Sequence, residues 1–199
     1  LGAEPLPADL ITKFSDLCPN KIKDVSNLYG PTESTVVASA YFYDEQSPPE
    51  DVSVGKPIGN GEIYIVKDNK LCGIGMEGEL CVGGEGVTRG YLNQPVLTDE
   101  KYVVIPKISN GRIYKTGDVG YWREDGTLKL LGRRDEQVKI NGYRIELSEI
   151  ESGLRQIEGI NDAVVIYDQS EKIPLFVAFY RGTKFESTNK IKELLKKNL

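Results

Sequence analysis

Three segments of the sequence combine aromatic, hydroxyl, acidic and basic residues in patterns that could bind a ligand. Residues 27–33 read Asn-Leu-Tyr-Gly-Pro-Thr-Glu and bring Tyr29, Thr32 and Glu33 close together. An aromatic ring can stack on a base, a hydroxyl can bond a phosphate, and a carboxylate is the oxygen ligand that Mg²⁺ prefers. Taken alone, the segment is better explained as a turn in which the threonine and the glutamate cap the next element.

The second segment, residues 114–118, reads Tyr-Lys-Thr-Gly-Asp and places Asp118 just after a glycine at the end of a predicted strand. An ionised carboxylate accepts two hydrogen bonds at once, which suits the vicinal diol of a ribose. An aspartate that closes a turn explains the same residues. By itself, this segment favours the turn.

The third segment, residues 132–144, is dense in arginine and lysine around Asp135. Arginine offers a rigid fork for phosphate, and lysine offers a mobile point charge that can follow developing negative charge. The alternative is a solvated hairpin with cross-strand salt bridges, each contributing about 0 to 1 kcal/mol. Local chemistry does not distinguish the two.

Composition narrows the chemistry that is available. The chain has 199 residues and a net charge of -5, which disfavours nucleic acid as a partner. It contains 0 histidines, so Ser-His and Cys-His relays are excluded, and Cys18, Cys72 and Cys81 form no CxxC pair that would suggest zinc or a disulfide framework. No apolar run approaches the roughly 20 residues that span a bilayer. We therefore expect a cytoplasmic protein without a membrane partner.

Hydrophobic patterning predicts an α+β fold with a strand-rich middle part. Between Val52 and Leu131, short β-type runs alternate with Asp-Asn, Gly-Gly and Asp-Gly turns, which is typical of a barrel-like or sandwich-like region. Ser148 and Glu151 read as a capping box that opens a helix ending near Ile157. The predicted strands cover residues 25–29, 36–44, 62–66, 79–82, 111–114, 127–131, 163–167 and 175–180, and the other helical segments cover residues 6–17, 98–102 and 187 onward.

Taken in order, the segments resemble the adenylate-forming superfamily, and in particular the amino-acid adenylation domains of nonribosomal peptide synthetases. The same segments also resemble those of D-alanine-activating ligases. The resemblance covers essentially the whole chain. It is carried by Asn27 through Glu33, Gly78 through Gly84 with Thr88 through Leu92, Tyr114 through Asp118, and Gly132 through Glu151. Agreement of all these blocks in one order is far more specific than any one of them.

The resemblance implies a reaction between ATP and a carboxylic acid that gives an acyl-adenylate and pyrophosphate. The acyl group then passes to the phosphopantetheine arm of a carrier protein, and Mg²⁺ assists. The implied nucleotide-binding residues are Gly2, Ala3, Glu4, Tyr29, Gly30, Thr32, Asp118, Leu130 and Arg133. The implied catalytic residues are Thr32, Glu33 and Lys139, with Glu33 as the metal ligand. Leu1, Leu28, Val36 and Val37 match substrate-pocket positions, Asp135 matches the hinge, and Gly142 matches the pantetheine tunnel.

The resemblance also implies an organisation. Residues 1–45 would end the α/β part of a large domain, residues 46–134 would form a barrel-like subdomain, and residues 135–199 would form a small α+β domain. The family's phosphate loop lies upstream of Leu1 and its catalytic lysine downstream of Leu199, so we expect the 199 residues alone to be inactive. An acyl- or aryl-CoA ligase and a non-catalytic binding module are the alternative functions.

Overall fold

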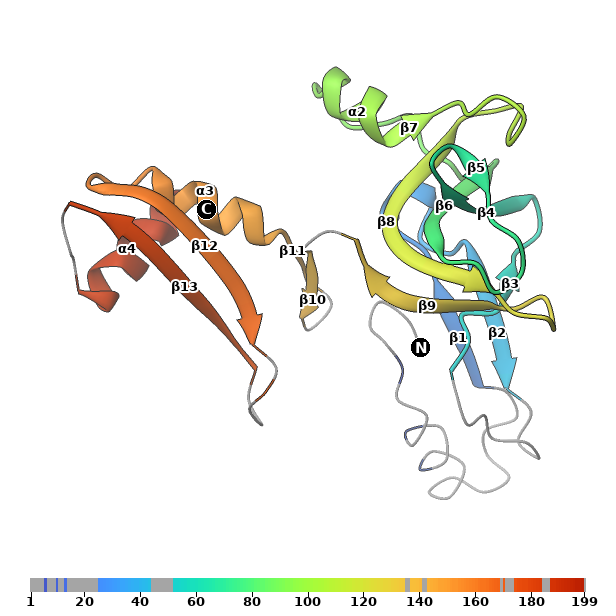
Figure 1. The fold of residues 1–199 in the computed structure, drawn as a ribbon, viewed down its shortest axis with the longest axis horizontal. Helices are drawn as coiled ribbons and strands as arrows, with labels where there is room; N and C mark the ends of the chain where they lie inside the picture. The colour runs from blue at the N-terminus through green and yellow to red at the C-terminus, as the bar shows by residue number, and fades with distance from the viewer. Residues whose placement is uncertain are drawn as a thin grey trace. The chain divides into compact units, whose positions relative to one another are not determined.

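The computed structural model describes residues 6, 10, 13, 25–43, 52–134, 137–140, 143–168, 170, 174–183 and 187–198. The chain divides into two compact units, Leu1–Asp135 and Glu136–Leu199, which we call the first and the second unit. Antiparallel sheets and separate helices make up both units (Figure 1), which confirms the predicted α+β class. The helix predicted over residues 6–17 falls largely outside the described residues.

The first unit opens with a small antiparallel sheet of order β1-β2-β3. Its elements are β1 (Val25–Tyr29), the 3-10 turn η1 (Thr32–Ser34), β2 (Ser39–Tyr43) and β3 (Lys56–Pro57). The strand predicted from residue 36 begins only at Ser39. The reason lies in Thr35 and Val36, whose φ angles of 61° and 72° lie in the left-handed region and interrupt the extended chain.

A six-stranded sheet of order β5-β4-β6-β8-β7, with β9 paired to β8, makes up most of the first unit. Its elements are β4 (Gly61–Lys67), β5 (Lys70–Leu71), β6 (Gly78–Gly84), α2 (Pro95–Lys101), β7 (Tyr102–Val103), β8 (Ile113–Trp122) and β9 (Leu128–Arg133). β8 curves strongly between its neighbours and is much longer than the predicted run (Figure 1). The turn predicted at Asp125 and Gly126 does connect β8 to β9.

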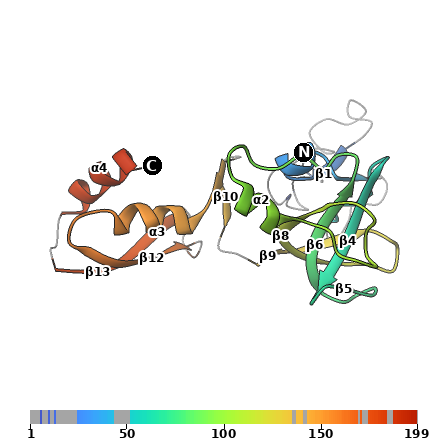
Figure 2. The same ribbon diagram turned by 90° about the horizontal axis from the view of Figure 1, so that it is seen from above.

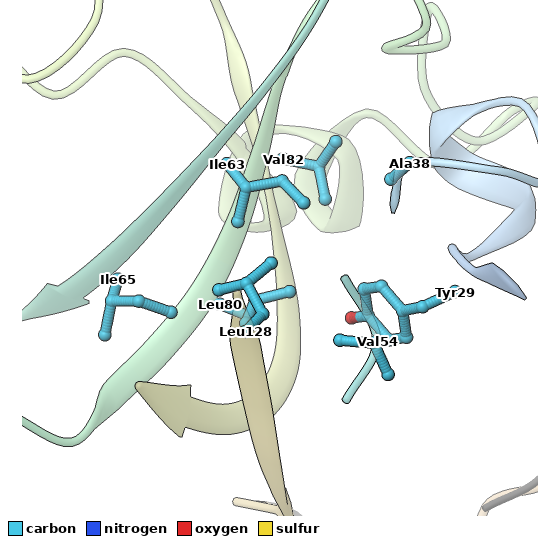
Figure 3. Close-up of a cluster of buried hydrophobic side chains, with 8 residues drawn as sticks. All are labelled: Tyr29, Ala38, Val54, Ile63, Ile65, Leu80, Val82 and Leu128. Atoms are coloured by element: carbon cyan, nitrogen blue, oxygen red, sulfur yellow. The ribbon is translucent and has the colours of Figure 1, made fainter. Parts of the chain in front are cut away.

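The core of the first unit lies between these two sheets. Alternate residues of β4 and β6 face the same side, and the antiparallel register pairs Ile63 with Val82 and Ile65 with Leu80. Figure 3 shows these side chains together with those that close the cluster, namely Tyr29, Ala38, Val54 and Leu128. The opposite faces of β4 and β6 are covered as well, because Val66 and Cys81 belong to a second buried cluster with Ile105 and Ile113.

The second unit is a small α+β fold. Its elements are β10 (Val138–Ile140), β11 (Tyr143–Ile145), α3 (Leu147–Arg155), β12 (Ile160–Asp168), β13 (Leu175–Gly182) and α4 (Thr188–Asn198). β12 and β13 form an antiparallel pair, and α3 lies against β12 (Figure 2). The buried core comes from α3 and β12, and apolar residues of α4 pack against it.

The capping box predicted at Ser148 and Glu151 is wrong. α3 begins at Leu147 with Glu146 as its N-cap, so Ser148 already lies inside the first turn. The Glu151 carboxylate instead accepts hydrogen bonds from the backbone N–H of Val165 and from Arg155, both at 3.0 Å. This glutamate therefore fastens the helix to β12, and that tertiary contact replaces the local one.

Candidate active site

Asp118 joins three strands of the first unit. Its Oδ2 atom accepts a hydrogen bond of 2.5 Å from the hydroxyl of Tyr29 on β1, and its Oδ1 atom accepts one of 2.9 Å from Nη1 of Arg133 on β9. The side chains of Arg133 and Asp118 are only 13% and 11% exposed, so their ion pair is largely desolvated. The Thr116 hydroxyl accepts the Asp118 backbone N–H at 2.9 Å, which fixes the chain just before the carboxylate.

Burial controls the state of the Tyr29 phenol. Desolvation first, and the negative charge of Asp118 second, raise the pKa of Tyr29 well above its ordinary value. The hydroxyl therefore stays protonated and acts as a donor. Its ring belongs to the core cluster and is 7% exposed, so the phenol is held rigidly beside the carboxylate.

Glu33 on η1 is the second buried carboxylate of the first unit. Glu33 is 8% exposed. Its Oε1 atom accepts hydrogen bonds from the hydroxyl of Tyr91 at 2.7 Å and from that of Tyr114 at 2.9 Å. The two phenol oxygens lie 3.3 Å apart. Burial, followed by hydrogen bonds to Tyr114 and Glu33, raises the pKa of Tyr91, so this phenol also remains a donor.

Backbone packing shapes the turn that carries Glu33. A Cβ atom added to Gly30 would lie 2.6 Å from both the Ala38 nitrogen and the Val36 oxygen, so only glycine fits this close approach. The loop after β6 is bonded to the same turn, because the Thr88 N–H donates to the Glu33 carbonyl at 2.9 Å. The Thr35 hydroxyl donates to the Gly86 carbonyl at 2.7 Å.

The remaining predicted site residues fall in different surroundings. Thr32 is exposed, immediately before Glu33, and Leu130 packs against the core cluster that contains Tyr29. Leu28 and Val37 are half-buried, whereas Val36 is 67% exposed. The backbone of Lys139 lies in β10, where it pairs with Arg144 on β11. Leu1, Gly2, Ala3, Glu4, Asp135 and Gly142 lie outside the described residues.

Tyr91 and Tyr114 were not predicted as site residues, although both lie within segments that carry the family resemblance. Within the described ranges, no group of three or more histidine, cysteine, aspartate or glutamate side chains is placed to hold a metal ion. No helix in the described part of the chain has the length and apolar character needed to cross a membrane.

Comparison with known proteins identifies the family. Residues 1–92 match the family described as AMP-binding enzyme. Gramicidin S synthase 2 from Aneurinibacillus migulanus is 46% identical over 170 residues, which cover 85% of this chain and 4% of that protein. Residues 1–92 therefore belong to the AMP-binding enzyme family. Tyrocidine synthase 3 from Brevibacillus parabrevis is 42% identical to this chain over 201 residues, which cover 100% of the chain and 3% of the synthase.

Solved structures agree with this family. A nonribosomal peptide synthetase protein containing adenylation and PCP domains matches with a TM-score of 0.80 and 26% identity, over 96% of this chain and 33% of the other. The o-succinylbenzoate CoA synthetase of Bacillus subtilis matches with a TM-score of 0.80 and 28% identity, over 98% and 38%. The resemblance predicted from the motifs is confirmed, and the chain spans a small part of each relative.

Proposed function

We propose that the protein to which this chain belongs activates an amino acid with ATP and loads it onto a carrier protein. A carboxylate oxygen of the amino acid attacks the α-phosphorus, pyrophosphate leaves, and aminoacyl-AMP forms. The phosphopantetheine thiol then attacks the acyl carbon and releases AMP. One observation carries the proposal: this chain, 46% identical to a gramicidin synthase over 170 residues, has two buried carboxylates, Asp118 and Glu33, and each accepts a hydrogen bond from a tyrosine.

Asp118 is proposed to bind the ribose of ATP. An ionised carboxylate has about four lone-pair sites, so Asp118 has acceptor capacity beyond the bonds from Tyr29 and Arg133. Tyr29 is proposed to contact the adenine, together with Leu130 and the segment of Gly2, Ala3 and Glu4. Arg133 would add a second contact to ribose or phosphate, and the protein contributes mainly positioning and charge neutralisation.

Glu33 is proposed to bind the Mg²⁺ that accompanies ATP. Mg²⁺ is usually held through one or two carboxylates together with substrate phosphates and water, rather than by an all-protein cage. A buried glutamate outside any larger acidic cluster among the described residues fits that mode. When bound, Mg²⁺ would neutralise phosphate charge. Thr32, an exposed residue next to Glu33, would contact the α-phosphate through its hydroxyl.

The second half-reaction is proposed to use a domain movement. Asp135 is the proposed hinge, Lys139 would face the active site in the second pose, and Gly142 would line the pantetheine tunnel. The division of the chain between Asp135 and Glu136 supports a hinge there. The proposed parts of the chain are residues 1–45, 46–134 and 135–199. The residues proposed to line the amino-acid pocket are Leu1, Leu28, Val36 and Val37.

Coenzyme A is the second candidate acceptor. The CoA synthetase from Bacillus subtilis matches this chain with the same TM-score, 0.80, as the adenylation–PCP protein, so the fold serves both acceptors. The curated synthetases at 42% and 46% identity favour the carrier protein.

The test is amino-acid-dependent exchange between ATP and pyrophosphate in the protein expressed from the full reading frame. Exchange with one amino acid supports the proposal and names the substrate, whereas exchange with aryl or fatty acids alone favours a CoA ligase. A comparison of the rate of carrier-protein loading with the rate of thioester formation on CoA then identifies the acceptor. A folded protein without any exchange would be a non-catalytic binding module.

A further inference from the structure

Two phenols donate hydrogen bonds to the same oxygen of the Glu33 carboxylate. Tyr91 and Tyr114 both donate to Oε1, at 2.7 and 2.9 Å, and they come from different parts of the chain. Tyr91 lies in the loop that follows β6, and Tyr114 lies on β8 and is 1% exposed. Two donors on one oxygen fix the plane of the carboxylate, whose terminal torsion is otherwise broadly distributed.

The phenols are themselves held in place by a tyrosine cluster. The Tyr102 ring lies 5.7 Å from that of Tyr91 and 5.0 Å from that of Tyr114, measured between centroids. The Tyr102 hydroxyl lies 2.7 Å from Oγ1 of Thr88. Arg112 lies over the Tyr102 ring at 5.4 Å and donates to the Thr88 carbonyl at 3.0 Å. The donors therefore belong to a packed layer and not to free surface side chains.

We propose that Tyr91 and Tyr114 are positioning residues for the Glu33 carboxylate and aim it at the Mg²⁺–phosphate group of ATP. The inference rests on the proposed function, in which Glu33 is the metal ligand. Partners that hydrogen-bond a ligating carboxylate orient it, and losing such a partner weakens metal affinity or activity by roughly 10- to 100-fold. The two tyrosines act through Glu33, so they need no contact with the nucleotide.

The test uses the protein expressed from the full reading frame and measures binding by calorimetry. The probes are α,β-methylene-ATP, with and without Mg²⁺, and AMP in EDTA. Tyr91→Phe is expected to weaken Mg²⁺-dependent binding of the analogue by roughly 10-fold and to leave AMP affinity unchanged. Tyr114→Phe and the double variant are expected to follow the same pattern, with the largest loss in the double variant.

Tyr64→Phe is the matched control, because it removes a phenol-to-glutamate hydrogen bond of 2.8 Å at an exposed site elsewhere in the first unit. It is expected to bind both probes like the unmodified protein. Since Tyr91 is half-buried, Tyr91→Phe keeps the test open even where Tyr114→Phe fails to fold.

Two results overturn the inference while leaving the proposed function standing. In one, the phenylalanine variants show the same Mg²⁺ dependence as the unmodified protein. In the other, affinity for AMP and for the analogue falls by the same factor, which marks a purely structural role. If the unmodified, folded protein binds neither probe, the proposed function fails and the inference fails with it.

Discussion

Replacing Asp118 with alanine is expected to destabilise the first unit and, on the proposed function, also to weaken ATP binding. From the sequence alone, a ribose-binding aspartate could be removed without harm to the fold. The structure alters that expectation, because Asp118 accepts from Tyr29 at 2.5 Å and pairs with Arg133 at 2.9 Å in a largely desolvated site. Its removal leaves the buried Tyr29 phenol and the largely desolvated Arg133 guanidinium without this acceptor.

The magnitudes follow from these contacts. Breaking a buried ion pair by removing one partner costs about 3–5 kcal/mol, so Asp118→Ala should lower the free energy of unfolding by that amount. Tyr29→Phe removes one hydrogen bond to a charged group and should cost about 1.5–3 kcal/mol. In the Asp118→Ala background, Tyr29→Phe should cost far less, which gives a coupling energy of about 1–3 kcal/mol.

Fluorescence-detected urea unfolding of the chain measures these values in the first unit. The sequence contains a single tryptophan, Trp122, which lies on β8 and packs against the core cluster. Its fluorescence emission therefore reports on the unfolding of the first unit. Tyr64→Phe serves as the control and should change stability by no more than about 0.5 kcal/mol. Additivity of Tyr29→Phe and Asp118→Ala within about 0.5 kcal/mol would show that the short hydrogen bond has no energetic coupling, and the reasoning would be refuted.

Three further predictions address other contacts. Gly30→Ala should lower the free energy of unfolding by about 1–3 kcal/mol because its Cβ meets backbone, whereas Gly59→Ala, with nothing within 4 Å, should leave it nearly unchanged; denaturant titration compares the two. Burial raises the pKa of Cys81 to about 12. Above about pH 8.5 the thiol ionises in the unfolded chain but not in the folded one, so the free energy of unfolding should fall as pH rises. Peptide mapping after alkylation should find Cys81 modified only in the unfolded chain. Glu151→Ala should speed amide exchange along β12, whereas exposed Glu149→Ala should not, and equal rates would contradict the helix-to-strand contact.

Strands were more predictable than the limits of helices and turns. Short β-type runs bounded by turn residues placed β4 and β6 correctly, and residues of both strands join the core cluster. The start of β2 was missed because two residues, Thr35 and Val36, adopt left-handed angles that propensity does not predict. The capping box failed because the Glu151 side chain found a partner on β12, and local patterns carry no information about such tertiary contacts.

The candidate site shows the same division. Asp118 and Glu33 stand in short, recognisable segments, so the sequence pointed to both. Their partners were harder to predict, because Tyr91 and Tyr114 lie 58 and 81 residues from Glu33, and Tyr29 lies 89 residues from Asp118. Pairing across such separations follows from strand register and loop packing and not from local spacing.

Contacts of this kind give a physical reason for the blocks to occur together in one chain. The segment that ends in Glu33 and the loop that contains Thr88 hold each other through two backbone-directed hydrogen bonds, one of them from Thr35 to Gly86. The Tyr91 phenol adds a third bond, to the Glu33 carboxylate itself. A substitution in either block therefore changes the surroundings of the same carboxylate. On the proposed function, the loop after β6 belongs to the metal-binding site although it contributes no ligand.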